Sequence, residues 1–185
     1  LTELMEFTSD ETGRHIKRVA EYSQLLAQLH NSLTEEDAIV IFHASPMHDI
    51  GKVFVPEAIL HKPGKLTVEE YDVMKTHTTR AHDFLKNSPR RILKAADIIA
   101  WQHHEHWDGS GYPRGLKGHD IHIYGRIVAV ADVFDALTHK RVYKPAWTVE
   151  DTVAYIVNNS GTHFDPYLVE LFRDNLDQFI NLAEV

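Results

Sequence analysis

The chain has 185 residues, with 27 acidic residues, 19 lysines and arginines, 14 histidines and a formal net charge of −8. Cysteine is absent, which excludes disulfide frameworks, thiolate metal sites, cysteine nucleophiles and iron–sulfur clusters. The acidic balance argues against binding a nucleic acid polymer, and no apolar run is long enough to span a membrane. Length and composition indicate one folded domain over residues 1–185. Because the chain begins with Leu1 and shows no signal-peptide pattern, we expect a fragment of a longer, regulatory protein with a cytoplasmic location.

Helical periodicity runs through almost the whole chain. A first helix is predicted from about Asp10 to Leu29, and Thr34 carries the capping signature of a second helix that ends near Ala44. The segment 109–118 is the longest stretch without periodicity, and such ordered loops are often functional. Further helices are predicted over residues 67–85, 90–102, 123–137, 148–157 and 166–180. The pattern predicts an all-α protein, a single compact bundle of about seven helices.

Histidines and carboxylates recur at predicted helix ends and interior faces. Glu11 and His15 are four residues apart and share one helix face. His48 and Asp49 end an apolar helix, and neighbours that diverge by about 100° suit a cluster in which one residue bridges two metals. A bare carboxylate at a position as apolar as that of Asp132 would be costly unless paired or metal-bound. The full set, from five predicted helices, is Glu11, His15, His48, Asp49, His77, His103, His104 and Asp132.

Each member of this set has an ordinary explanation when it is taken alone. A helical histidine is more often a packed or surface side chain than a ligand, and an aspartate in an apolar helix is more often hydrogen-bonded to a cap or an arginine. The joint placement of all these residues nevertheless favours a metal centre. Imidazoles and carboxylates without thiolates suit iron, manganese or zinc.

Seven short motifs follow one another along residues 8–176. They are Glu11-Thr-Gly-Arg-His15, His48-Asp-Ile-Gly-Lys52, Leu60-His-Lys-Pro-Gly-Lys65, His103-His-Glu-His-Trp-Asp-Gly-Ser-Gly-Tyr-Pro113, Ala131-Asp-Val-Phe-Asp-Ala-Leu137, Arg141-Val-Tyr-Lys144 and Gly161-Thr-His-Phe-Asp-Pro166. In content and order these motifs resemble the HD-GYP branch of the HD-domain phosphohydrolases. The resemblance implies a helical bundle of the HD-domain type.

The resemblance also implies hydrolysis of the bacterial second messenger cyclic di-GMP at a cluster of two or three divalent metals, with iron expected first and manganese second. Glu11 matches the position that supplies an extra carboxylate in three-metal members. Asp49 is the candidate bridge, and a hydroxide held between the metals would attack phosphorus to give linear pGpG and/or GMP. The matching ligand positions are His15, His48, Asp49, His77, His103, His104 and Asp132.

An acidic protein needs local cations to hold a substrate that is a dianion. Lys52 lies one helical turn after His48, and we expect it to act in catalysis and phosphate binding. Arg141 and Lys144 resemble the phosphate contacts of the family. The alternative for all three is an ordinary solvated surface charge.

The loop that contains Gly111-Tyr112-Pro113 is expected to contact substrate or a partner. Tyr112 could stack on a guanine, and the resemblance suggests docking of a diguanylate cyclase-type domain through this loop; a purely structural loop is equally compatible with the sequence. Asp108 and Asp135 are expected to orient ligand histidines or to cap helices. Glu105 has no predicted role.

Two alternatives to a cyclic di-GMP phosphodiesterase stay open. The domain could be a catalytically weak cyclic-dinucleotide-binding or partner-docking module, although a complete ligand set is more than such a module requires. It could also hydrolyse another cyclic dinucleotide, such as the mixed GMP–AMP compound.

Overall fold

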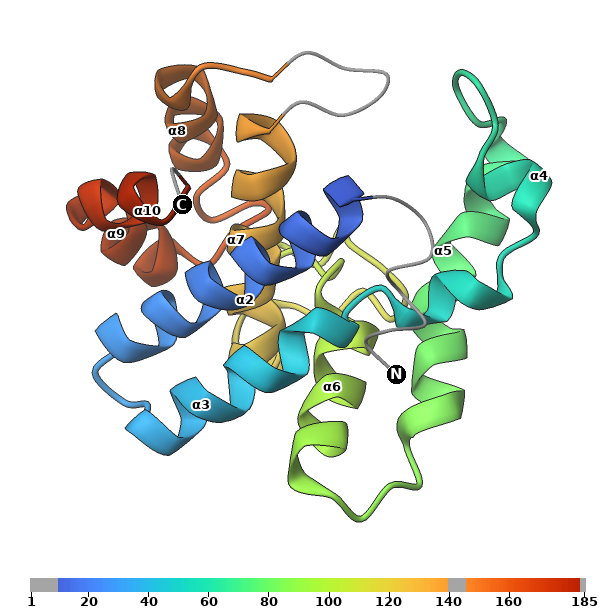
Figure 1. The fold of residues 1–185 in the computed structure, drawn as a ribbon, viewed down its shortest axis with the longest axis horizontal. Helices are drawn as coiled ribbons and strands as arrows, with labels where there is room; N and C mark the ends of the chain where they lie inside the picture. Colours follow the sequence, from blue (N-terminus) through green and yellow to red (C-terminus); the bar gives the residue numbers. More distant parts are fainter. Residues whose placement is uncertain (1–9, 140–145, 184–185) are drawn as a thin grey trace.

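The computed structural model describes residues 10–139 and 146–183, with side chains from residue 13 onward (Figure 1). Within these ranges the regular structure is helical, apart from one isolated bridge between Ser160 and Phe164, so the all-α prediction is confirmed. The α-helices are α2 (Asp10–Leu29), α3 (Glu35–Ala44), α4 (Glu57–Leu60), α5 (Val68–Leu85), α6 (Arg91–Gln102), α7 (Ile123–Thr138), α8 (Val149–Asn158), α9 (Pro166–Asp174) and α10 (Leu176–Ala183). Short 3-10 helices are η2 (Ser45–Met47), η3 (Ile50–Phe54) and η4 (Gly118–Asp120).

The core forms where α2, α3, α6 and α7 pack on one another. Figure 1 shows α2 crossing in front of α7, with α4 and α5 on one side and α8 to α10 on the other. The rings of Tyr22, Phe134, Phe172 and Phe179 are fully buried and meet edge to face, with centroids 5.1 Å apart for the first pair. Such aromatic packing contributes beyond its buried area. It anchors α7 and therefore the position of Asp132.

Capping residues place the helix starts where the sequence predicts them. Thr34 and Asp37 form a capping box at the start of α3, and Thr67 and Glu70 form another at α5. Each such cap stabilises its helix by about 1 kcal/mol. The Thr67 box sets the register of α5 and thus the face that carries His77.

Two local predictions are wrong. The helix predicted over residues 166–180 is divided into α9 and α10 at Asn175, whose side-chain amide donates to the carbonyl of Leu171 over 2.9 Å and closes α9. His48 and Asp49 do not end an α-helix but lie between η2 and η3. Pro46 explains this, because it has no N–H for an α-helical hydrogen bond and ends the regular helix.

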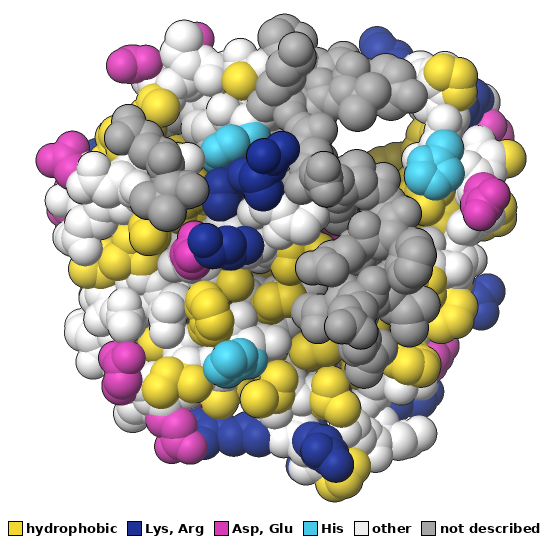
Figure 2. Space-filling model, in the orientation of Figure 1, with side chains coloured by type: hydrophobic (Ala, Val, Ile, Leu, Met, Phe, Trp, Pro, Cys, Tyr) yellow, Lys and Arg dark blue, Asp and Glu magenta, His cyan; other side chains and the backbone are white. Residues whose placement is uncertain are grey.

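A mostly apolar groove of about 380 Å³ lies between α2, α3, η2 and α6. Figure 2 shows hydrophobic side chains gathered on this face of the molecule. Its lining residues are Lys17, Ala20, Phe42, His43, Pro46, Met47 and Leu93. None of the seven predicted metal ligands whose side chains are described lines this groove. In the described parts of the chain, no helix is long and apolar enough to cross a bilayer.

Candidate metal centre

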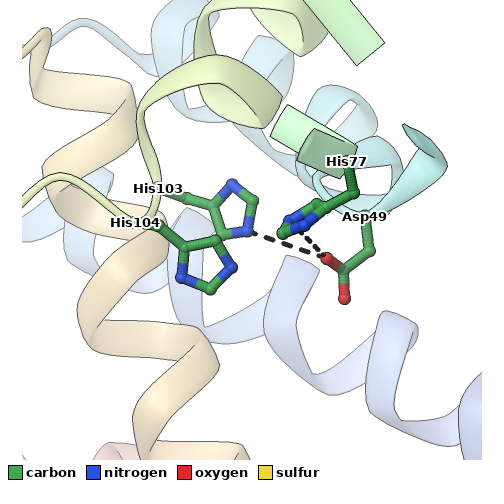
Figure 3. A group of neighbouring side chains, drawn as sticks. All are labelled: Asp49, His77, His103 and His104. Carbon is green, nitrogen blue, oxygen red and sulfur yellow. Dashed lines mark ion pairs between the residues drawn. The ribbon is translucent and has the colours of Figure 1, made fainter. Parts of the chain in front are cut away.

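The fold brings seven predicted ligands together from five places in the chain. Asp49, His77, His103 and His104 form one group, which we call the Asp49 group, and His15, His48 and Asp132 form a second, the Asp132 group. Within each group one ligand atom per residue lies within 4.8 Å of the others. In Figure 3, three imidazoles from α5 and the end of α6 converge with the carboxylate of Asp49. The first and last of these ligands, His15 and Asp132, are more than a hundred residues apart in the sequence. The site is therefore created by the packing of the helices.

Asp49 connects the two groups. Its Oδ1 lies 3.3 Å from Nε2 of His77 and 3.8 Å from Nε2 of His103, while its Oδ2 lies 3.5 Å from Nε2 of His48. The two oxygens thus face different groups, so Asp49 would be able to offer one oxygen to a cation in each group. In the Asp132 group, Oδ1 of Asp132 lies 3.5 Å from Nε2 of His15.

Backbone carbonyls orient three of the imidazoles. Nδ1 of His48 donates to the carbonyl oxygen of Ser45 over 2.8 Å. In the same way, Nδ1 of His77 donates to the carbonyl oxygen of Met74 over 2.8 Å, and Nδ1 of His103 donates to that of Ile99 over 3.0 Å. A ring that donates from Nδ1 presents the Nε2 lone pair to the site. Local backbone geometry therefore selects the tautomer that binds a metal.

The donor atoms pass a physical test for a bound cation. Four buried atoms at this place have no hydrogen-bond partner among the residues that the structure describes: Nε2 of His48, His77 and His103, and Oδ1 of Asp49. Each unsatisfied buried polar atom costs about 1–3 kcal/mol. A divalent cation between them would satisfy all four, so the residues fit a metal centre.

The charges in the site also suit a cation. Burial lowers the pKa of His77, and burial together with the neighbouring His48 lowers that of His103 to about 3. Burial opposes ionisation of Asp49, but Lys52 and His48 hold its pKa well below the ordinary value. Neutral imidazoles and an ionised carboxylate are the forms that bind divalent metals.

His48 behaves differently because it faces the most negative charge. Burial lowers its pKa, but the carboxylates of Asp49 and Asp132 outweigh burial and raise it to about 9. This is the imidazole that must release a proton when a cation binds at neutral pH.

Lys52 and Tyr112 lie next to the Asp49 group. The Lys52 ammonium donates to Oδ2 of Asp49 over 2.5 Å, and the lysine side chain stays 39% exposed. The ring of Tyr112 stacks on that of His104, with centroids 4.7 Å apart and planes inclined by 21°. Lys52 therefore sits between the carboxylate and solvent, whereas Tyr112 covers a predicted ligand.

The buried carboxylate of Asp135 orients His15 through the ring nitrogen that faces away from the Asp132 group. Oδ2 of Asp135 accepts from Nδ1 of His15 over 2.7 Å, and Oδ1 accepts from Nε of Arg18 over 2.5 Å. Burial would raise the pKa of Asp135, but hydrogen bonds from His139, His15 and Arg18 lower it. The sequence pattern predicts that Asp108 and Asp135 orient ligand histidines or cap helices. Asp135 orients His15, whereas Asp108 accepts the backbone N–H of Ser110 within its own loop.

Sequence reasoning missed two residues that support the site. Glu105 is only 2% exposed and accepts the backbone N–H groups of Arg114 and Leu116 over 2.8 and 2.9 Å, so it anchors the loop that carries Tyr112. The signal available in the sequence was a carboxylate directly after two histidines that are both predicted ligands. The second residue that sequence reasoning missed is Arg18, which lies three residues after His15 on the same helix face and donates to Asp135.

Three predicted site residues cannot be placed. The side chain of Glu11 lies outside the described residues, although its backbone belongs to the first turn of α2. Arg141 and Lys144 also lie outside the described residues. Their metal-binding and phosphate-binding roles stay predictions.

A family model described as HD domain matches residues 2–168. This chain belongs to the HD domain family. Two curated relatives are from Vibrio cholerae. One is named 3'3'-cGAMP-specific phosphodiesterase 2; it is 49% identical, and the match covers 97% of this chain and 34% of the relative. The other is named cyclic di-GMP phosphodiesterase; it is 43% identical, and the match covers 99% of this chain and 40% of the relative. A cyclic di-GMP phosphodiesterase of Thermotoga maritima is 45% identical, with 93% of this chain and 46% of the relative covered. With these relatives, the predicted HD-GYP membership of this HD domain is confirmed.

Two solved structures share the fold of the HD domain. A cyclic GMP-AMP specific phosphodiesterase from V. cholerae aligns with a TM-score of 0.67 at 21% identity, over 97% of this chain and 50% of that one. An HDG"Y"P protein from Bdellovibrio bacteriovorus aligns with a TM-score of 0.70 at 18% identity, over 92% and 54%. The chain spans less than half the length of the curated relatives named above.

Proposed function

We propose that this HD domain is a metal-dependent phosphodiesterase that hydrolyses cyclic di-GMP to linear pGpG and/or GMP. The observation that carries the proposal is the convergence, in two adjacent groups joined by Asp49, of four buried donor atoms that have no hydrogen-bond partner in the described part of the chain. The relatives named cyclic di-GMP phosphodiesterases support the substrate.

The donor set fits one divalent ion in each group, and Glu11 is the candidate ligand for a third. Iron is our first choice and manganese the second, because both accept mixed imidazole and carboxylate ligands. Bound ions would supply Lewis-acid neutralisation of the phosphate charge and activation of water for attack.

The residues around the groups bind and orient the substrate. Asp49 ties the two groups together, so a phosphate between them has one defined position. Lys52, half exposed beside Asp49, is placed to donate to a phosphate oxygen at the mouth of the site. Arg141 and Lys144 are proposed to contact phosphate as well. Tyr112 covers His104 and limits the access of water to that imidazole.

A second candidate substrate has a specific observation in its favour. The relative that is 49% identical to this chain is named a 3'3'-cGAMP-specific phosphodiesterase. Hydrolysis rates measured side by side on cyclic di-GMP and 3'3'-cGAMP would decide which substrate this domain prefers.

The proposal is tested with anaerobically purified protein, by an element-resolved metal count and by turnover of cyclic di-GMP. We expect two or three ions per chain in the wild type. Asp49→Ala should lower turnover by more than the roughly 10–100-fold that loss of an outer partner of a ligand costs. Asp83→Ala is the matched control, because Asp83 is an exposed carboxylate on α5 that pairs only with Lys86 among the described residues.

Two outcomes would contradict the proposal. Undiminished turnover in metal-loaded Asp49→Ala would remove the assigned bridge. Tight binding of cyclic di-GMP without hydrolysis, in reduced and metal-loaded wild type, would favour the binding-module alternative.

The expected cytoplasmic location and the docking of a diguanylate cyclase-type domain on Gly111-Tyr112-Pro113 stay predictions. The loop is well suited to be a rigid docking surface, because Glu105 holds it by two backbone hydrogen bonds. Binding of a purified cyclase domain to wild type and to Tyr112→Ala, compared by calorimetry, would test the contact.

A further inference from the structure

Two tyrosines form an aromatic surface beside the Asp49 group. Tyr112 is stacked on His104, whereas the ring of Tyr71, on α5, lies 6.4 Å from that of Tyr112 at an angle of 80°. Tyr71 is 48% exposed. The ring of Tyr112 therefore covers the predicted ligand His104. The ring of Tyr71 is exposed to solvent and contacts His104 only through Tyr112.

Tyr112 links this surface to the metal centre. Its ring lies 4.7 Å from that of His104, a member of the Asp49 group, and 6.4 Å from that of Tyr71. The side chains of Tyr71 and Tyr112 are also hydrogen-bonded to each other. A nucleotide whose phosphate lies at the Asp49 group would therefore have the exposed ring of Tyr71 only two ring contacts away.

A cation lies next to the two rings. Nζ of Lys75, one turn after Tyr71 on α5, is 5.3 Å from the centroid of Tyr71 and 5.9 Å from that of Tyr112. The same ammonium donates to the carboxylate of Asp72 over 2.6 Å, which holds it in place. Lys75 keeps further N–H groups for a ligand, because an ammonium has three donors.

We propose that Tyr71 and Lys75 form a purine subsite in which the exposed ring of Tyr71 stacks on a base of the cyclic dinucleotide and Lys75 donates to the O6 and N7 acceptors of guanine. The inference rests on the proposed function for the identity of the substrate. Aromatic rings stack on any base. The lysine adds discrimination, since adenine presents an N–H donor where guanine presents O6.

A competing explanation is that Tyr71 only positions Tyr112 through its hydroxyl. Two substitutions separate the explanations. Tyr71→Phe keeps the ring and removes the hydroxyl, whereas Tyr71→Ala removes both. Phe84→Ala is the matched control, because Phe84 is also on α5, is 55% exposed and is not among the proposed site residues.

The stacking test uses the metal-loaded full chain and two substrates, cyclic di-GMP and the base-free diester methyl 4-nitrophenyl phosphate. Tyr71→Ala should raise KM for cyclic di-GMP by about 10–100-fold, the range expected for one lost base stack, with little change in kcat. Tyr71→Phe and Phe84→Ala should stay close to wild type. All variants should hydrolyse the base-free diester equally. An unchanged KM in Tyr71→Ala, or equal losses in Tyr71→Phe and Tyr71→Ala, would overturn the stacking role.

A binding assay keeps this test separate from the proposed function. A cyclic dinucleotide with 2-aminopurine in place of one base should lose fluorescence on mixing with wild type or Tyr71→Phe, because stacking quenches that base. It should stay bright with Tyr71→Ala. If no diester is hydrolysed but this pattern is seen, the proposed function fails and the subsite stands; if diesters are hydrolysed and all variants quench equally, the subsite fails.

The guanine preference is tested with Lys75→Met on cyclic di-GMP and cyclic di-AMP. The ratio of kcat/KM for the guanine over the adenine substrate should fall about tenfold, the lower part of the range for one base contact. Lys86→Met is the control, because Lys86 directly follows the last residue of α5 and pairs with Asp83 over the same 2.6 Å. An equal loss on both substrates would overturn the base contact and leave only a general attraction for phosphate.

Discussion

At the scale of single residues, four of the five imidazoles of the centre are oriented by a hydrogen bond from their second nitrogen. His48, His77 and His103 donate to backbone carbonyls, which no side-chain substitution removes. His15 is different, because it donates to the side chain of Asp135, which in turn accepts from Arg18. The Asp132 group is therefore the part of the site that depends on a side-chain relay.

We predict that Asp135→Asn weakens metal binding in the Asp132 group by about 10–100-fold, the usual effect of losing an outer partner of a ligand. The protein should also lose about 3–5 kcal/mol of unfolding free energy, because Arg18 keeps its charge in a mostly buried position. Competition with a chelator and urea unfolding measure the two effects. Asp108→Asn, whose side chain caps a loop turn, should keep wild-type metal affinity; wild-type affinity in Asp135→Asn would refute the relay.

At the scale of elements, the site depends on how closely η3 approaches α5. A Cβ added to Gly51 would lie 1.8 Å from the carbonyl oxygen of His77, so the two backbones are in direct contact. Gly51 lies two residues after Asp49. The contact therefore sets the distance between Asp49 and His77, two members of the Asp49 group.

Gly51→Ala should force η3 away from α5. We expect a loss of at least about 1–3 kcal/mol in stability, the usual cost of overpacking, together with a lower metal count. Gly13→Ala is the control, because no atom of the described residues lies within 4 Å of a Cβ there and alanine favours a helix. Thermal unfolding and element analysis of both variants are the measurements, and a full metal content in Gly51→Ala would contradict the argument.

At the scale of the whole molecule, a partly buried neutral histidine links stability to pH. His163 lies between α8 and α9, with its ring stacked on Phe164 at 4.1 Å and 3.9 Å from that of His106. Burial and the neighbouring His106 lower its pKa to about 4, from 6.5 for an unperturbed histidine. The unfolded chain therefore takes up this proton first as the pH falls, so folding stability is lost from about pH 6.5 down to about pH 4.

We predict that His163→Phe, which keeps a stacking ring, reduces this loss. Between pH 7 and pH 5 the unfolding free energy of the variant should fall by up to about 2 kcal/mol less than that of wild type. Urea unfolding of the chelated proteins measures the difference, and above pH 7 the two pH profiles should run parallel. Identical slopes between pH 7 and pH 5 would mean that His163 takes up its proton over the same pH range in the folded and the unfolded protein, which would contradict the lowered pKa.

Much of this protein is determined by short-range features of its sequence. Helical periodicity and the boxes at Thr34 and Thr67 predict the helices, since both depend on residues within one or two turns. The motifs also indicate which histidines and aspartates to consider as ligands, because their types and order are visible without a fold. The break at Asn175 and the short helices around His48 escaped prediction because single hydrogen bonds and one proline decide them.

The tertiary structure decided how these residues meet. Sequence spacing could not divide the donors into two groups, show that the oxygens of Asp49 face both, or place Asp135 behind His15, because each contact joins helices far apart in the chain. The roles of Glu105 and Tyr71 depend on contacts of the 109–118 loop: Glu105 accepts a backbone N–H of this loop, and Tyr71 contacts its Tyr112. The physical reason is that a metal centre needs donor atoms placed within a few tenths of an ångström, and only the packing of α2, α5, α6 and α7 sets distances of that kind.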